Sequence, residues 1–469
     1  MICQDVVHAA SNARVKLPKH VSLGITIKHL TRSKQLITLL NRMGHCCSYE
    51  QTEIVETALA DETIARSELN GGVIIPSNIS PGVFGHMAAD NNHFNEETID
   101  GKNTTHVTTF VAFQRKQHAP ATPPMEIYVD HSERKRSLDS SRPIVTVEDI
   151  NIGGRRPAVT NYVNKITNAS WLQPNDNFLS ACQDDLVWLI LRMCSNTMFE
   201  ENYQTVDAQK IPGWSGFQSL RFSDPSTPTS IGYLPMIQAD ANEYSTINTV
   251  MKLSLKMANA LGQSESVVTF DLAIYVKAKQ LQMRYPGEFK NVVVRLGGFH
   301  IALNYLSLLG KMYSNSGLED LLIESGVYAP GTTTGLVAGK SYNRGVRAHK
   351  LCFEALFRLM WKTFASWLEE SSQGLDEISK TKALELLNQC KDSDNKEEYL
   401  KENWHLLKDG LSALVRLFKE FENEGKVKLH LFAFWSEYMS MVSFLLQFIK
   451  AERTGNLHLS STAKMLPYF

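Results

Sequence analysis

The segment from Ser266 to Lys311 constrains the fold of this chain more than any other. It begins with a run of β-branched residues, Val267 to Thr269, which predicts a short buried strand. A helical pattern follows from Leu272 to Arg284, a second strand pattern from Asn291 to Leu296, and a second helical pattern from Phe299 to Met312. Strands that alternate with helices over such short connections form a parallel sheet. The sequence therefore predicts an α/β domain whose ligands bind at the carboxyl ends of its strands.

The composition is that of a folded chain with a nearly neutral surface. Its 469 residues are 43% apolar and 21% charged, and the net charge is −1. Contact with nucleic acid would therefore depend on local basic surfaces. Seven cysteines without a C-x-x-C pair predict reduced thiols, as in a cytosolic or nuclear protein. Even the most apolar span, Phe432 to Ala451, contains charged residues, so we expect a soluble chain with no membrane partner.

Residues 1–80 are predicted to be helical. The first fifty residues hold seven Lys or Arg against Asp5 and Glu50, a net charge of +5. A helix is predicted there, with the apolar stripe Leu36, Leu39, Leu40 and Met43. Gly44 then breaks this helix, and Ser48 can cap a second one that runs to about Ser67. Two interpretations stay open: a helix-turn-helix seated on DNA, or a helical hairpin with solvated lysines.

A hairpin and an insertion are predicted next. Val83 to Ala89 has the pattern of a strand that ends on Asp90, and a polar turn leads to a second strand from Val107 to Gln114. Periodicity then fades over about 115–230, which we interpret as an insertion with one helix near 175–200. A third strand from Gly232 to Ile237 and a helix from Tyr244 to Leu261 complete the region before Ser266.

This element order resembles the RNase H-like fold of retroviral-type integrases and many cut-and-paste transposases. The resemblance implies a mixed sheet with a long insertion over 81–312, flanked by the N-terminal helical region and by a helical region over 313–469. It also implies two metal-binding aspartates, one on the first strand and one just after the fourth, which are Asp90 and Asp271 here. Carboxylates on neighbouring strands can hold two divalent cations, Mg²⁺ or Mn²⁺, ~4 Å apart for phosphodiester cleavage. The alternative is that each aspartate only caps the turn or helix after its strand.

Two further resemblances concern origin. Mutator-like transposases carry a C-x-x-H motif after the next strand, and RLGGFH places His300 correctly but has Gly297 where the cysteine would stand. Without that thiolate a zinc site is not expected, and the glycines more simply allow close backbone approach. The blocks LNRMGHCCSYEQ, SVVTFDLAIYVKA and RLGGFHIALNYL look like those of a poorly characterised, multicopy, transposon-derived family of invertebrate genomes.

A third acid would have to come from a later helix. On a helix over 339–370, Glu354 shares a face with cations and is expected to be an exposed ion-pair partner. Glu437 lies on a helix that is apolar nearly all round, where a desolvated carboxylate costs several kcal/mol unless it is paired or bound to metal. We therefore take Glu437 as the predicted third catalytic residue, with a position beyond Phe469 as the alternative.

A basic stripe on the same 339–370 helix is the candidate DNA-contacting surface. Its main members are Lys340, Arg344, Arg347, Lys350 and Arg358. Contacts to phosphates would release counterions and make binding strongly salt-dependent. The alternative is a solvated outer face balanced by the acidic residues that follow the helix.

Two functions follow from these patterns. The first is a transposon-derived, nuclear protein that nicks or transfers DNA strands with a divalent metal. The second is a catalytically inactive relative that binds DNA or protein. A serine or cysteine hydrolase is not supported, because no nucleophile motif such as G-x-S-x-G is present.

Overall fold

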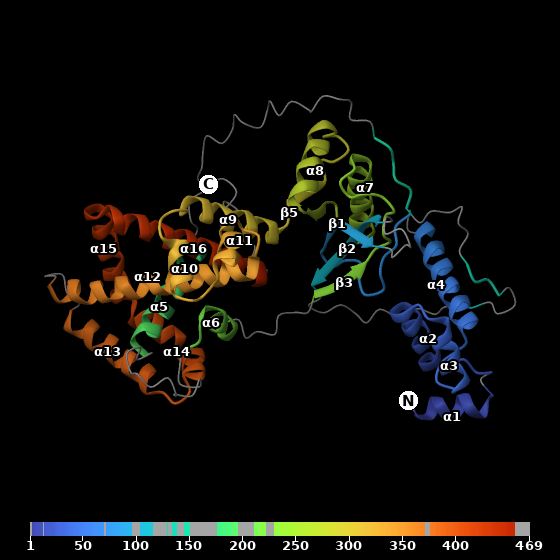
Figure 1. The fold of residues 1–469 in the computed structure, drawn as a ribbon, viewed down its shortest axis with the longest axis horizontal. Coiled ribbons are helices and arrows are strands. Elements are labelled where there is room, and N and C mark those ends of the chain that lie inside the picture. Colours follow the sequence, from blue (N-terminus) through green and yellow to red (C-terminus); the bar gives the residue numbers. More distant parts are fainter. Residues whose placement is uncertain are drawn as a thin grey trace. The chain divides into compact units, whose positions relative to one another are not determined.

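The computed structural model describes residues 2–12, 14–69, 72–95, 104–115, 129, 134–137, 145–150, 176–195, 211–221, 229–370 and 376–454. Over these residues the chain is mixed α/β, with one five-stranded mixed sheet and sixteen helices (Figure 1). The predicted α/β class is confirmed. The chain forms two compact units: Met1–Val159 with Thr227–Leu296, and Thr160–Ser226 with Gly297–Phe469.

The first unit contains the sheet, whose strand order is β3-β2-β1-β4-β5. Strand β1 pairs antiparallel with β2, and β2 pairs antiparallel with β3. On its other side β1 pairs parallel with β4, which pairs parallel with β5. The strands are β1 Gly85–Asn95, β2 Thr104–Arg115, β3 Thr229–Tyr233, β4 Ser266–Phe270 and β5 Val292–Leu296.

Helices α7 (Tyr244–Ala260) and α8 (Leu272–Arg284) contact the central and parallel strands. Burial alternates along β4, with Ser266, Val268 and Phe270 buried and the residues between them only partly so. Because side chains alternate across a strand, one face of the sheet carries the apolar core. Met87 of β1 belongs to the same core. The sequence patterns predicted β4, α7, α8 and β5 to within two residues at each end.

The predicted hairpin is present, but its first strand is longer than expected. Strand β1 continues through Asp90 to Asn95, and the antiparallel register with β2 extends from Gly85↔Gln114 to Asn95↔Thr104. Asp90 is therefore inside the strand. Polar Asn and Thr residues do not end a strand when a partner strand satisfies their backbone groups. The third strand, expected at 232–237, lies at 229–233, and Ile237 forms only an isolated bridge to Thr108.

Four helices precede the sheet: α1 Ile2–Ala10, α2 Pro18–Thr31, α3 Lys34–Arg42 and α4 Tyr49–Leu69. The helix break is confirmed at Gly44, which has a φ of +78°. The predicted cap is also present, because the Ser48 hydroxyl accepts a hydrogen bond from the Gln51 amide at 3.2 Å. Two residues of the predicted apolar stripe, Leu39 and Met43, are 51% and 60% exposed. Ile37 is the residue of α3 that is buried.

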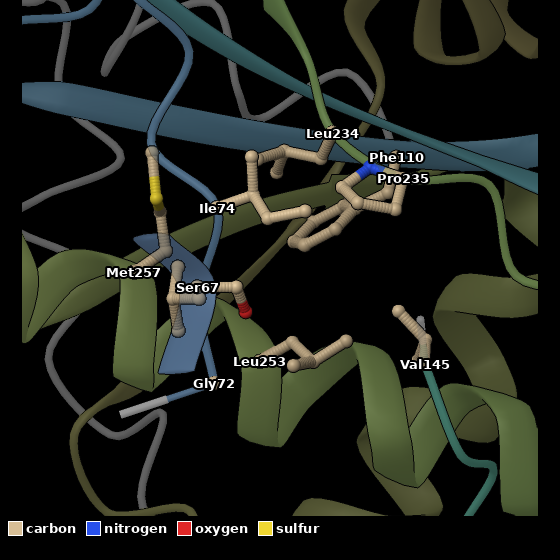
Figure 2. Close-up of a pocket in the computed structure, with 10 residues that line it drawn as sticks. Ser67, Gly72, Ile74, Phe110, Val145, Leu234, Pro235, Leu253 and Met257 are labelled. Carbon is tan, nitrogen blue, oxygen red and sulfur yellow. The ribbon is translucent and has the colours of Figure 1, made fainter. Parts of the chain in front are cut away.

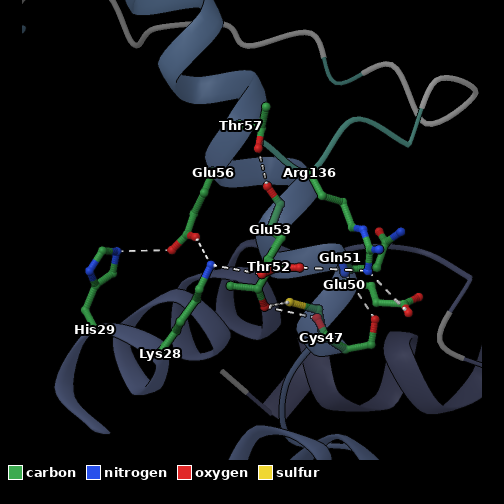
Figure 3. Close-up of polar contacts among 11 residues, drawn as sticks. Lys28, His29, Cys47, Glu50, Gln51, Thr52, Glu53, Glu56, Thr57 and Arg136 are labelled. Carbon is green, nitrogen blue, oxygen red and sulfur yellow. Dashed lines mark hydrogen bonds and ion pairs between the residues drawn. The ribbon is translucent and has the colours of Figure 1, made fainter. Parts of the chain in front are cut away.

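Ion pairs join α2 to the acidic helix α4 (Figure 3). The Lys28 ammonium lies 2.6 Å from Glu56, and His29 lies 3.1 Å from the same carboxylate. Glu50 lies 3.5 Å from Arg136. Helix α4 would be the DNA-reading helix of an α3–α4 helix-turn-helix, yet it carries six acidic residues and one arginine. Like charge with phosphate disfavours that arrangement, so the helical-hairpin interpretation fits better.

The second unit is helical. Its elements are α5 Asp176–Ser195, α6 Trp214–Arg221, α9 Gly298–Met312, α10 Leu318–Glu324, α11 Pro330–Val337, α12 Tyr342–Glu370, α13 Glu377–Asp392, α14 Lys396–Gly410, α15 Ser412–Lys428 and α16 His430–Thr454. The helix expected near 175–200 is present as α5. We expected the sheet domain to include residues up to 312, but the units divide at Leu296. The physical reason is that α9 packs on α11, α12 and α16, and that α5 and α6 of the insertion pack on helices of this unit.

Candidate functional site

The two candidate metal-binding aspartates belong to neighbouring parallel strands of the first unit, with Asp90 inside β1 and Asp271 directly after β4. Strands β1 and β4 pair through Met87↔Val268 and Ala88↔Thr269. Continuing this register by two residues places Asp90 opposite Asp271. Both positions have the parity of the sheet face that points away from the α7–α8 core. Asp90 is exposed and Asp271 is partly buried. Asp90 therefore lies within β1, and Asp271 follows the end of β4 directly as the N-cap residue of α8.

Each carboxylate has one oxygen in a local hydrogen bond. Oδ1 of Asp271 accepts from the Ile274 amide at 2.8 Å and so caps α8. Oδ1 of Asp90 accepts from the Asn91 amide, also at 2.8 Å. The capping role that the sequence offered as the alternative is therefore present at Asp271, whereas Asp90 lies inside β1 and caps no turn or helix there. Because a carboxylate has two oxygens with about four acceptor positions, capping leaves room for a cation ligand.

Glu437 does not have the environment predicted for a third acid. It lies on α16 of the second unit and is exposed, whereas its neighbours Ser436 and Tyr438 are buried. Phe434, one turn earlier, is 39% exposed and lies on the same side of the helix. An apolar helix need not be buried all round, so the argument from a desolvated carboxylate is wrong for Glu437. Within the described residues, no three His, Cys, Asp or Glu side chains form a group that could hold a metal ion.

The RLGGFH turn has a packing role. Gly297 precedes α9 as its N-cap residue. A Cβ added to Gly298 would stand 2.5 Å from the Glu452 carboxylate, so the glycine allows the α16 side chain to approach α9 closely. His300 is partly buried and contacts Phe299 edge-on at 5.7 Å between ring centres.

The predicted basic stripe divides into two parts, and Lys340 lies outside the helix because α12 begins at Tyr342. Lys340, Arg344 and Arg347 are exposed. Lys350 donates a hydrogen bond to the Ser215 hydroxyl at 3.0 Å and lies 5.6 Å from the centre of the Trp214 ring. Burial lowers the pKa of both Lys350 and Arg358. The first three residues are therefore the part of the stripe that can reach a phosphate without moving.

Glu354 is an ion-pair partner, as predicted, but its partner and exposure differ from the prediction. Its carboxylate lies 2.8 Å from the Arg192 guanidinium of α5, and its side chain is only 14% exposed. Arg192 also donates to the Ile211 carbonyl at 2.5 Å, just before α6. This pair therefore ties α12 to the insertion helices.

Among the described residues of the second unit, the most buried carboxylate is Asp185, which sequence reasoning did not single out. Its oxygens accept hydrogen bonds from Trp214 Nε1 at 3.0 Å, Gln218 Nε2 at 2.8 Å and Gln447 Nε2 at 2.7 Å. The buried Lys450 is also within electrostatic reach. Burial raises the pKa of Asp185 to about 6, against the lowering effects of Lys450, Trp214 and Gln218. The sequence feature that could have identified Asp185 is its place at the start of a strongly apolar segment of the insertion, Asp185 to Cys194.

A second buried polar cluster joins α12 to α16. His349 Nδ1 lies 2.8 Å from the Tyr438 hydroxyl, and both side chains are buried. Burial lowers the pKa of His349 to about 4. It also raises the pKa of the Cys352 thiol to about 11, so this thiol is not a ready nucleophile near neutral pH. The cluster has the properties of a structural contact.

Acidification should therefore weaken the second unit through His349. The unfolded imidazole titrates near pH 6.5 and the folded one near 4, so the stabilisation is complete above 6.5 and is lost as the pH falls towards 4. His349→Asn can keep a polar atom facing Tyr438 and cannot titrate. When the pH is lowered from 7 to 5, the unfolding free energy of the variant, measured with urea, should rise by about 2 kcal/mol relative to that of the parent. A pH-independent difference between the two proteins would contradict this assignment.

One pocket in the first unit is too small to bind a ligand (Figure 2). Its volume is about 20 Å³, which is room for about one water molecule. Apolar side chains dominate its lining, among them Ile74, Phe110, Leu234 and Leu253. We assign it to imperfect packing between the sheet and α7.

The fold defines a two-unit protein of mixed α/β class. No helix among the described residues is long and apolar enough to cross a membrane. Residues 213–469, more than half of the chain, match the family described as a domain of unknown function, DUF8702. The chain belongs to this family. No curated protein and no solved structure matches it.

Proposed function

We propose that the first unit is an RNase H-like domain of transposase origin that cuts or joins DNA strands. One observation carries the proposal: Asp90 lies within β1 and Asp271 directly follows β4, the parallel neighbour of β1 in a sheet ordered β3-β2-β1-β4-β5, and extending their register by two residues sets the two positions opposite each other. The strand order, with one helix before β4 and one after it, supports the RNase H-like comparison. Such a protein would act in the nucleus.

Asp90 and Asp271 have the chemistry that a hard divalent cation requires. Both candidates are carboxylates, and Asp90 is open to solvent. When bound, Mg²⁺ or Mn²⁺ would activate a water or a 3′-hydroxyl and stabilise the leaving oxygen. Asp271 is held in place by its capping hydrogen bond to α8, which fixes the carboxylate before any ligand arrives. Lys340, Arg344 and Arg347 are the proposed phosphate contacts, with Lys350 and Arg358 available only if their present contacts change.

Asp271→Asn tests this proposal, because it removes one negative charge at nearly constant volume. The amide oxygen can still cap α8, so the melting temperature without metal should change by less than about 4 °C. With Mg²⁺ or Mn²⁺, the parent should nick or join a DNA end and should be stabilised by the metal. The variant should lose both effects, and its cleavage rate should fall at least a hundredfold. Cleavage is read on labelled duplex DNA and stabilisation by calorimetry.

Asp240→Asn is the matched control. Asp240 is also an aspartate of the first unit whose Oδ1 accepts a backbone hydrogen bond, from the Asn242 amide at 2.8 Å. Its replacement should leave metal stabilisation and cleavage unchanged. Equal loss in both variants would indicate a general charge effect and would count against a metal site at Asp271.

A catalytically inactive binding protein is the second candidate function. It is favoured because, among the described residues, no three His, Cys, Asp or Glu side chains form a group that could hold a metal ion, and because Glu437 is exposed. A parent protein with neither cleavage nor metal-dependent stabilisation would leave only this function.

A further inference from the structure

The exposed stripe of α3 is the least explained surface of the first unit. Leu36, Leu39 and Met43 follow one another at spacings of three and four residues, so they lie along one side of the helix. All three are exposed, as is Leu30 in the last turn of α2. Single exposed apolar residues are ordinary, but a run of them along one helix marks an interaction surface.

The residues beneath this stripe are held in place by burial and hydrogen bonds. Ile37, Cys46 and Cys47 are buried. The Asn41 side-chain amide donates to the Cys46 carbonyl at 2.8 Å. The Cys47 backbone amide donates to the His20 carbonyl at 3.0 Å. These bonds hold the turn after α3 against α2. The stripe is therefore presented in a fixed conformation, which lowers the entropic cost of binding.

The rim of the stripe is basic. From Leu30 to Tyr49 the sequence contains no acidic residue, and it contains Arg32, Lys34 and Arg42. Lys34 lies 5.3 Å from the centre of the Tyr49 ring. Among the described residues, Arg32 and Arg42 form no ion pair, whereas Lys28 nearby is paired with Glu53 and Glu56. Positive charge around the apolar stripe is thus available to a partner.

We propose that the α3 stripe binds an acidic amphipathic helix of a partner protein. The apolar side chains would receive the apolar face of that helix, and Arg32 and Arg42 would pair with its flanking carboxylates. A second copy of this chain fits poorly, because pairing two α3 stripes brings their arginines together. Duplex DNA would satisfy the cations but leaves three exposed aliphatic side chains in the middle of the contact. This surface is independent of Asp90 and Asp271.

Selection from a peptide library tests the proposal on the full chain. Random helix-forming peptides displayed on phage are selected on the parent protein and counter-selected on the Leu39→Ser/Met43→Ser variant. We expect the retained peptides to be net negative, with apolar residues at helical spacing. A synthetic copy should bind at least tenfold more weakly to the double variant and to Arg32→Glu/Arg42→Glu. Because these side chains are exposed, the melting temperatures should match the parent's.

Val427→Ser is the control, since Val427 is an 88% exposed apolar residue of the second unit, and it should leave peptide affinity unchanged. Three results would overturn the proposal. The first is that the selection retains no peptide that distinguishes the parent from the double variant, or retains only basic and neutral peptides. The second is that a 20-base-pair duplex or phosphatidylserine vesicles bind the parent and bind the Leu39→Ser/Met43→Ser variant at least tenfold more weakly, as expected of the peptide. The third is that the parent elutes as a dimer and the double variant as a monomer.

Discussion

Asp185→Ala is expected to lower the unfolding free energy of the second unit by about 3–5 kcal/mol. The substitution removes the acceptor shared by Trp214, Gln218 and Gln447, whose donor groups lie 2.7–3.0 Å from the carboxylate. It also leaves Lys450, buried nearby, without the opposite charge of Asp185. A buried donor or cation that loses its partner costs far more than the intact pair contributed. Urea unfolding followed by tryptophan fluorescence measures the change, because Trp188, Trp214 and Trp404 lie in this unit.

Asp176→Ala is the control, on the same helix α5. Asp176 is exposed in the first turn, where its interaction with the helix dipole contributes less than about 1 kcal/mol. The pH dependence gives a second check. Burial raises the folded pKa of Asp185 to about 6, so its contribution is greatest at low pH and is lost as the pH rises through 6. The parent should therefore gain stability from pH 7 to pH 5 relative to Asp185→Ala. A loss below 1 kcal/mol in Asp185→Ala would show that the cluster is open to water.

Residues 297–469 expressed alone are expected to remain unfolded, and adding residues 176–221 in trans should restore a cooperative unfolding transition. The fragment lacks α5 and α6, although both helices pack within the second unit. Five consecutive residues of α5, Val187 to Leu191, are at most 2% exposed. At about 1.5–3 kcal/mol for each buried apolar side chain, their loss approaches or exceeds a whole domain's stability of about 5–15 kcal/mol. Circular dichroism and thermal unfolding of the separate and mixed segments measure the result.

The matched control is the 176–221 segment with Leu191→Asp, which places a charge at a buried position and should fail to restore folding. The fragment 213–469, which is the part that matches the family, contains α6 but still lacks α5 and should also fail alone. If 297–469 unfolds cooperatively at the parent's temperature without the added segment, α5 and α6 are not part of its core.

The elements with strong local signals were predicted closely. The α8 pattern matched its helix from Leu272 to Arg284, and the β-branched run before it became β4. Such elements are set by side-chain periodicity and by capping groups within a few residues, as Asp271 shows by bonding the Ile274 amide. The parallel pairing of the strands that lead to Asp90 and Asp271 agrees with the element order of the resemblance, and a shared metal site there stays a prediction.

Positions that depend on distant neighbours were predicted less well. Asp90 was expected to end its strand, but pairing with β2 carries β1 on to Asn95. The apolar stripe of α3 gave no sign of which residue is buried, and it is Ile37, outside the stripe, that turns inwards. Helices α5 and α6 lie within an insertion in the sheet domain, and no local pattern shows that they join the other unit.

Asp185 and Glu437 show most clearly where the sequence is sufficient and where it is not. Each is a carboxylate on a largely apolar helix, and the sequence determined the helix, its length and its apolar content. Only the tertiary structure decided that Asp185 meets three donors near Lys450 while Glu437 faces solvent. The physical reason is that a helical pattern gives the angle between side chains, but the direction that becomes interior is set by the helices that pack on it.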